Sequence, residues 1–109
     1  MNMDHDTRMD IAYDFSREVR SRFGDHVTDI ILFGSLPRWE DEEDSDIDIL
    51  VIVNDDDTSL QRDLSFLSFD FGMKYGEFIS VQTVTRKHMD EFSTFSFFQN
   101  VLKEGITIG

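Results

Sequence analysis

The 109-residue sequence contains no cysteine and a single proline. Without cysteine, the chain cannot form disulfides, use a thiol nucleophile or bind zinc through thiolates. No hydrophobic run approaches the length that crosses a membrane, and the polar, acidic start has no apolar signal-peptide segment. We therefore expect a soluble, cytoplasmic protein that does not associate with membranes.

Positive charge is also scarce. The sequence has 10 Lys and Arg against 23 Asp and Glu, a net charge of −13 and a pI near 4.3. Such a surface repels polyanions, which argues against broad nucleic-acid binding. Lysine is rarer than arginine, and strong acidity is typical of proteins from salt-saturated cytoplasm, where salt screens the repulsion between carboxylates. We therefore hypothesise a halophilic, haloarchaeal origin.

Hydrophobic residues make up 39% of the chain, including 11 Phe, enough for the core of one domain spanning residues 1–109. Apolar periodicity predicts helices over 7–23, 58–75, 85–91 and 97–103, and strands over 27–33, 46–53, 78–84 and 106–108. This order predicts an α/β (α+β) fold, with a mixed sheet of about four strands and helices packed mainly on one face.

Helix ends are predicted from local signals. Capping boxes are expected at Thr7 with Asp10 and at Thr58 with Gln61. Thr85 is expected to cap the short third helix. Three glycines are expected to end helices, Gly24 in the left-handed conformation; they are Gly24, Gly76 and Gly105.

The most informative stretch is FGSLPRWEDEEDSDIDILVIV, residues 33–53. Asp46 and Asp48 are two apart at the start of a predicted strand, so both side chains project to one side. Two carboxylates about 4 Å apart repel by roughly 4 kcal/mol at an effective dielectric of 20, and an oxygen-seeking cation such as Mg²⁺ would offset this. The pair alone fits equally well with two solvated surface acids.

The residues before the acid pair favour the cation. Gly34 and Ser35 end a predicted strand and lead into a turn, where backbone N–H groups and a hydroxyl can bind an anion. Arg38, one turn later, can pair with a phosphate. A phosphate-binding bend beside cation-binding acids is the arrangement that phosphoryl transfer requires.

Gly34-Ser35-Leu36-Pro37-Arg38, then Ser45-Asp46-Ile47-Asp48 and the following apolar run, resemble the signature of the DNA polymerase β-like nucleotidyltransferase superfamily. The small size resembles its minimal branch. The resemblance implies a polymerase β palm-like fold. It implies that Gly34, Ser35, Arg38 and Ser45 bind a nucleoside triphosphate, most simply ATP. Asp46, Asp48 and Arg38 would be catalytic, with the two aspartates holding Mg²⁺.

The resemblance also implies a reaction and a partner. Members transfer a nucleoside monophosphate to a hydroxyl and release pyrophosphate. Minimal members commonly pair with a small helical HEPN-domain protein in a toxin–antitoxin system, and some transfer AMP to a tyrosine of the toxin. The alternative is an impaired nucleotide-binding antitoxin subunit that neutralises its partner by contact.

Two positions depart from the family pattern. Ser80 stands where the third strand usually carries a third Asp, and a hydroxyl is a weak Mg²⁺ ligand and no general base near neutral pH. Glu77 could reach into the site instead. Trp39 stands where the family usually has Gly, and it could cover a base or simply pack.

Other residues receive structural interpretations. The three histidines His5, His26 and His88 lack metal-ligand spacing and are expected at surfaces or helix ends. The acids at 40–44 are expected to be solvated loop. The Phe cluster at 92, 95, 97 and 98 is expected in the core or, alternatively, in a partner-binding patch, and Phe66 and Phe69 raise the same question.

A halophilic origin makes a direct prediction. Because salt screens carboxylate repulsion, the free energy of unfolding should rise with KCl in urea denaturation series. Maximal stability at low salt would contradict this origin.

Overall fold

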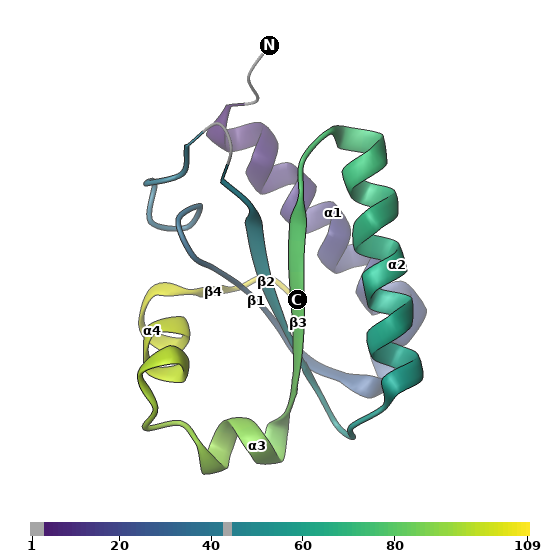
Figure 1. The fold of residues 1–109 in the computed structure, drawn as a ribbon, viewed down its shortest axis with the longest axis vertical. Helices are drawn as coiled ribbons and strands as arrows, with labels where there is room; N and C mark the ends of the chain where they lie inside the picture. The colour runs from purple at the N-terminus through teal and green to yellow at the C-terminus, as the bar shows by residue number, and fades with distance from the viewer. Residues whose placement is uncertain (1–3, 43–44) are drawn as a thin grey trace.

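The computed structural model describes residues 4–42 and 45–109. The first three residues and two of the loop acids, Glu43 and Asp44, lie outside the described part. The four strands are β1 (Val27–Phe33), β2 (Ile47–Val53), β3 (Ile79–Thr85) and β4 (Ile106–Thr107). They form one sheet in the order β3-β2-β1-β4, with β1 antiparallel to β2 and β4, and β2 parallel to β3 (Figure 1). The predicted mixed four-stranded sheet is confirmed.

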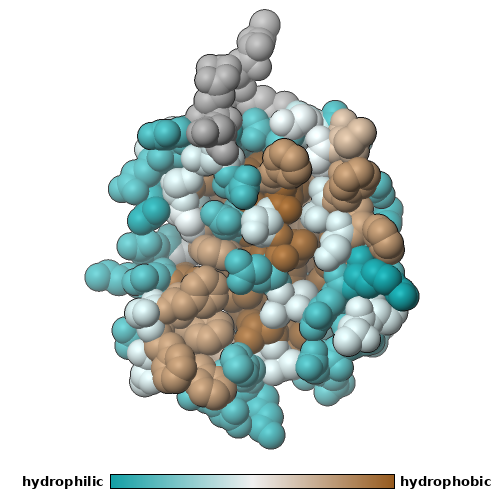
Figure 2. Space-filling model, viewed as in Figure 1, coloured by the Kyte–Doolittle hydropathy of each residue, from teal (hydrophilic) through white to brown (hydrophobic). Residues whose placement is uncertain are grey.

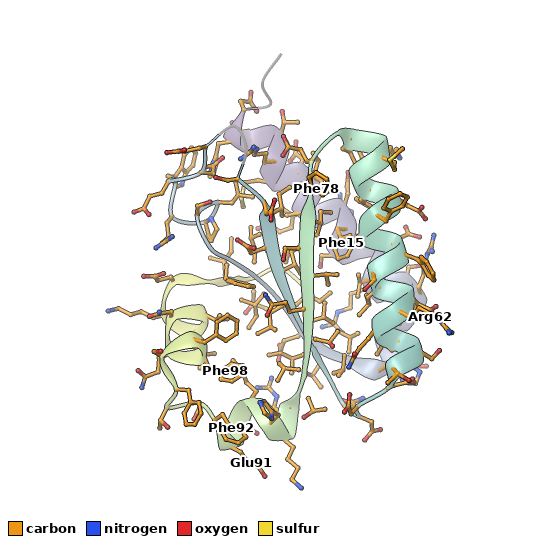
Figure 3. The ribbon with its side chains drawn as sticks, viewed as in Figure 1. Phe15, Arg62, Phe78, Glu91, Phe92 and Phe98 are labelled. Carbon is orange, nitrogen blue, oxygen red and sulfur yellow. The ribbon has the colours of Figure 1, made fainter. Side chains whose placement is uncertain are left out.

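Helices cover both faces of this sheet, the long ones together on one face. The helices are α1 (His5–Phe23), α2 (Thr58–Tyr75), α3 (Arg86–Glu91) and α4 (Ser96–Glu104), with a 3₁₀ turn, η1 (Gly24–His26), after α1. The main core lies between the sheet and α1 and α2 and includes Phe15 (Figure 3). Phe15 packs edge-on against Phe71. A smaller core lies under α3 and α4 and includes Met89 and Phe98.

Strand β2 divides its side chains between the two cores as its alternation predicts. One set packs in the main core: Ile47, Ile49, Val51 and Val53. Leu50 and Ile52 pack in the smaller core on the opposite face. Asp48 is half-buried on the same face as these two, one position before the apolar part begins. Asp46 precedes β2, which begins at Ile47, so of the two acids predicted to lie in the strand only Asp48 does so.

Both predicted capping boxes are wrong, because an aspartate just before each helix takes the cap. Asp4 accepts a hydrogen bond from the Thr7 backbone N–H at 2.8 Å, so α1 begins before Thr7. Asp57 accepts from the Ser59 N–H at 2.9 Å. Each Asp has an extended backbone, which turns its short carboxylate onto the free N–H groups of the first turn.

Of the other predicted helix ends, those at Thr85 and Gly76 are confirmed and the conformation predicted for Gly24 is wrong. Thr85 caps α3 by accepting from the His88 N–H at 3.0 Å, as predicted, and Gly76 ends α2 with φ of 72°. Gly24 has φ of −51° and continues into η1, so its predicted left-handed conformation is wrong. Gly105 follows α4 in an extended conformation, where its N–H donates to the Val101 carbonyl.

The C-terminal Phe cluster is split between core and surface. Phe98 is buried and Phe92 packs against the smaller core, while Phe95 and Phe97 remain exposed. Figure 3 shows Phe92 and Phe98 converging between α3 and α4. The core interpretation holds for Phe92 and Phe98, and a partner-binding patch at Phe95 and Phe97 stays a prediction. Among the helices of the described residues, none has the length and apolar character to cross a membrane.

Candidate active site

The chain bends sharply after β1. Gly34 has φ of +79°, a conformation that favours glycine. The Ser35 carbonyl accepts from the Arg38 N–H at 3.2 Å and from the Glu40 N–H at 3.0 Å, which closes the turn. Leu36 is buried in the main core and anchors the turn to the fold. The bend is thus a fixed part of the structure.

The bend lies against the Asp48 carboxylate. Phe33 is paired with Asp48 across β1 and β2, so Gly34 follows directly beside the acid. A Cβ atom placed on Gly34 would lie 2.2 Å from Asp48 Oδ2, closer than any van der Waals contact. Two independent constraints therefore favour glycine here, the backbone angle and the approaching carboxylate. The predicted neighbourhood of the bend and the acid is real.

Asp46 and Asp48 influence one another electrostatically. Burial, and secondly the negative charge of Asp46, raise the pKa of Asp48 above its ordinary value. Within the described residues, neither carboxylate accepts a hydrogen bond from the protein. Unpaired carboxylate oxygens that repel one another suit a hard divalent cation, and Mg²⁺ is commonly bound by one or two carboxylates plus water and phosphate. The donor set therefore fits Mg²⁺.

Ser80 lies beside this pair. In the parallel ladder Asp48 is paired with Ser80, and both residues are on the sheet face opposite the main core. Ser80 thus occupies the position from which a third carboxylate would face the same site. Across residues 4–42 and 45–109, no three His, Asp or Glu side chains form a metal-binding group.

Arg38 reaches back over the bend. Its Nε donates to the Gly34 carbonyl at 3.0 Å, and a terminal nitrogen lies 3.4 Å from Glu104 Oε2 at the end of α4. The guanidinium is thus held next to the turn that is predicted to bind phosphate. Glu40 Oε2 also lies 3.6 Å from Arg38 Nε, so a bound phosphate would exchange with two carboxylates, which are oxyanions like itself.

The two predicted nucleotide-binding serines differ in their present contacts. Among the described residues the Ser35 hydroxyl makes no hydrogen bond, so it is available to a ligand. The Ser45 hydroxyl accepts from the Glu42 N–H at 2.9 Å and thereby shapes the loop before β2. Its own proton remains free to donate.

Comparison with known proteins shows the family to which this chain belongs. Residues 13–107 match the family described as the nucleotidyltransferase domain. The chain belongs to this family.

Two proteins of Methanocaldococcus jannaschii, each described by name as a protein adenylyltransferase, are similar to this chain along most of their length. One is 36% identical over 92 residues, covering 84% of this chain and 88% of the relative. The other is 25% identical over 92 residues, covering 80% and 93%.

Solved structures share the fold. A crystal structure of a toxin–antitoxin with AMP-PNP superposes with a TM-score of 0.64 at 19% identity, covering 89% of this chain and 72% of the other. A nucleotidyltransferase from Sulfolobus solfataricus superposes with a TM-score of 0.56 at 18% identity, covering 94% and 80%. Both agree with the mixed sheet of this nucleotidyltransferase domain.

Glu77 does not complete the nucleotidyltransferase site. Its carboxylate pairs with the Arg8 guanidinium, 3.2 Å from one terminal nitrogen, and both side chains are almost fully buried. Arg8 also contacts Asp41 at 3.2 Å and the Glu42 carbonyl at 2.7 Å. Because a buried carboxylate that leaves its charged partner loses several kcal/mol, Glu77 stays with Arg8, and the suggestion that it reaches the acid pair is wrong.

Asp41 is likewise more than a solvated loop acid. Its carboxylate lies 3.0 Å from His5 Nδ1 and contacts buried Arg8. Burial acts to raise its pKa, but the hydrogen bonds from His5, from its own backbone and from Arg8 outweigh burial and lower the pKa. The expectation of a purely solvated acidic loop is wrong at this position, and Asp41 instead ties the loop to α1.

Trp39 packs on His5. The two rings are stacked, with centroids 3.4 Å apart and an interplanar angle of 15°. Trp39 has φ of 59°, in the left-handed region that glycine adopts most easily, and its side chain is 71% exposed. The structure thus shows that one face of the Trp39 ring packs on His5.

Sequence reasoning missed two residues, Arg8 and Glu104. Arg8 has a recognisable signal, because it falls on the helical stripe that continues through Ala12, Phe15 and Val19, all buried. A charged residue on an apolar stripe indicates a buried ion pair. Glu104 has no such signal, since only the return of α4 toward β1 brings it to Arg38.

The approach of Asp48 to Gly34 makes a matched pair of predictions. Gly34→Ala should lower the free energy of unfolding by about 1–3 kcal/mol, through the strained φ and the displaced carboxylate. Gly24→Ala should be neutral or stabilising by up to about 1 kcal/mol, because its φ is helical and a Cβ meets nothing within 4 Å. Urea denaturation measures both; equal effects would contradict the close approach.

The acid pair makes a second prediction. Because the folded-state pKa of Asp48 is raised, its ionisation destabilises the metal-free fold above that pKa, and this penalty disappears as pH falls and the carboxylate protonates. Asp48→Asn should therefore raise metal-free stability at neutral pH, by less than about 1 kcal/mol after solvent screening.

Added Mg²⁺ gives a second test of the Asp48→Asn variant. Added Mg²⁺ should stabilise the wild-type chain and not Asp48→Asn, since a ligand stabilises only the form that binds it. Asp63→Asn is the matched control because it removes one exposed acid of the same type on α2. If Asp48→Asn lowered metal-free stability, or if Asp63→Asn raised it equally, the acid pair would not be a cation site.

Proposed function

We propose that this nucleotidyltransferase domain transfers a nucleoside monophosphate, most simply AMP from ATP, to a hydroxyl group of a protein acceptor. The observation that carries the proposal is the Asp48 carboxylate lying against the Gly34 bend, with Arg38 over the same turn. Phosphate-binding groups and cation-binding acids are thereby brought to one place. The names of the relatives support a protein as acceptor.

Each site residue has a distinct role in this proposal. The backbone of the Gly34–Ser35 bend and the Ser35 hydroxyl hold the triphosphate, and Ser45 lies in the loop that borders it. Arg38 pairs with a phosphate oxygen after exchanging its two carboxylate partners. Asp46 and Asp48 would hold Mg²⁺, which neutralises the charge that develops on the phosphates.

The reaction is an in-line displacement. The acceptor oxygen bonds to the α-phosphorus while the bond to the β-phosphate oxygen breaks, and pyrophosphate leaves. The acceptor proton passes to a carboxylate or to water. Because Ser80 cannot take this proton near neutral pH, we expect turnover to be slow.

The proposed setting is the cytoplasm, in a pair with a small helical HEPN-domain protein of a toxin–antitoxin system. The fold similarity to a toxin–antitoxin crystallised with AMP-PNP supports this setting. Ser80 beside Asp48 favours one other function, a nucleotide-binding antitoxin subunit that neutralises its partner by contact, without transfer.

The test is incubation with α-labelled ATP, Mg²⁺, high KCl and the product of the adjacent gene. The wild type should label the partner protein. Asp46→Asn should reduce the rate at least about 100-fold because the cation site is lost. Ser80→Asp should raise the rate at least about tenfold, by restoring a carboxylate that can accept the proton.

Two controls separate the alternatives. Ser80→Ala removes the hydroxyl without adding a carboxylate and should leave the rate unchanged. If neither the wild type nor Ser80→Asp labels any acceptor while ATP still binds, the contact-only antitoxin function stands and the transferase proposal is rejected.

A further inference from the structure

The outer edge of β3 is an open strand edge next to an apolar groove. The sheet ends at β3, which is paired only with β2 within the described chain. Between α2 and β3 lies a groove of about 320 Å³ with a floor of small residues, Ser65, Ser68 and Gly72. Phe69, Met73 and Phe78 form its walls and are 64%, 73% and 78% exposed. Figure 2 shows apolar side chains gathered along α2 and above β3.

This edge lacks the protection that open strands usually carry. Isolated edges are normally guarded by charged residues, proline or a bulge. From Phe78 to Thr85 the sequence is FISVQTVT, without a charge or a proline, and its register with β2 is continuous over seven pairs. The chain has a net charge of −13. At this uncharged strand, two copies can pair without bringing the carboxylates of one copy against those of the other.

The backbone direction determines which residues are free to pair. The Ile47 N–H donates to the Phe78 carbonyl at 2.8 Å, so Phe78 points its backbone toward β2. Because successive residues of a strand alternate, Ser80 and Gln82 also point toward β2. Ile79, Val81 and Thr83 then present their N–H and C=O groups at the open edge.

We propose that β3 pairs antiparallel with β3 of a second copy of this chain, about a twofold axis at Val81. In this register Ile79 of each copy is opposite Thr83 of the other, and Val81 is opposite Val81, so all outward groups on these residues are satisfied. The occupant of the edge is thus a second copy, and the pairing extends the sheet across the dimer.

The available area suits a standard interface. A large aromatic side chain buries roughly 150–250 Å², so Phe69 and Phe78, which are 64% and 78% exposed, supply roughly 200–350 Å² between them, and Met73 adds to this. The strand edge itself, with Gln82 and Thr83, adds to this area, and a standard interface takes roughly 800 Å² from each partner. The negative charges on the rest of the two surfaces repel one another and so weaken association. Because salt screens this repulsion, the affinity of the dimer should rise as the salt concentration increases.

The test is the molar mass of the full chain by light scattering after size exclusion, at about 1–100 μM, the weak end of affinity for interfaces of this size. Measurements at about 0.15 M and about 1 M KCl span the relevant screening lengths. Wild type should reach twice the 12.8 kDa chain mass, at lower concentration in the higher salt. Phe78→Asp and Met73→Glu, both at well-exposed positions, should each weaken dimerisation at least about tenfold.

Phe95→Asp is the matched control, because it makes the same substitution at an exposed Phe before α4; it should leave dimerisation unchanged. Hydrogen exchange gives the strand-level readout: the Val81 and Thr83 amides should become protected only as the dimer forms, and the Ser80 and Gln82 amides at every concentration. A monomer throughout, equal effects of Phe78→Asp and Phe95→Asp, or a dimer without protection at Val81 and Thr83 would overturn the proposal. None of these readouts depends on nucleotide chemistry.

Discussion

The contact between the Gly34 backbone and the Asp48 carboxylate is the constraint on which the site depends. It exists because β1 and β2 are antiparallel neighbours, so the end of one strand meets the start of the other. A side chain at Gly34 would push the acid away, and a shift of β2 by one residue would turn Asp48 to the opposite face. The sheet register therefore sets both the bend and the acid in place.

Four carboxylates near the site fall into two groups, one paired with a buried arginine and one without a protein partner among the described residues. Asp41 and Glu77 are buried against Arg8, where the ion pair compensates for lost hydration and fastens the loop to α1. Asp46 and Asp48 have no protein partner among the described residues and repel one another. Asp41 holds the loop to α1 through Arg8, and among the described residues Asp46 and Asp48 have no hydrogen bond to lose on meeting a cation.

The loop between β1 and β2 stores some strain to reach this geometry. Trp39 has a positive φ although it is not glycine, and its stacking on His5 together with the Asp41 contacts compensates. Arg38, the preceding residue, is turned toward Gly34 and Glu104 instead. Two adjacent side chains thus link one loop to α1 on one side and to α4 on the other.

The sequence by itself determined the strands, the helices and the face on which Asp48 lies, because alternation and helical periodicity are local properties of the chain. The bend at Gly34 could also be predicted from the sequence, since the residues that form the turn are close together in the chain. Only the tertiary structure decided where Glu77, Glu104 and Asp41 point, because their partners are distant in sequence and are chosen by packing. The helix caps were also beyond the sequence. Asp4 and Asp57 cap α1 and α2 in place of the predicted Thr7 and Thr58, because their backbones are extended, and residue type alone does not specify that conformation.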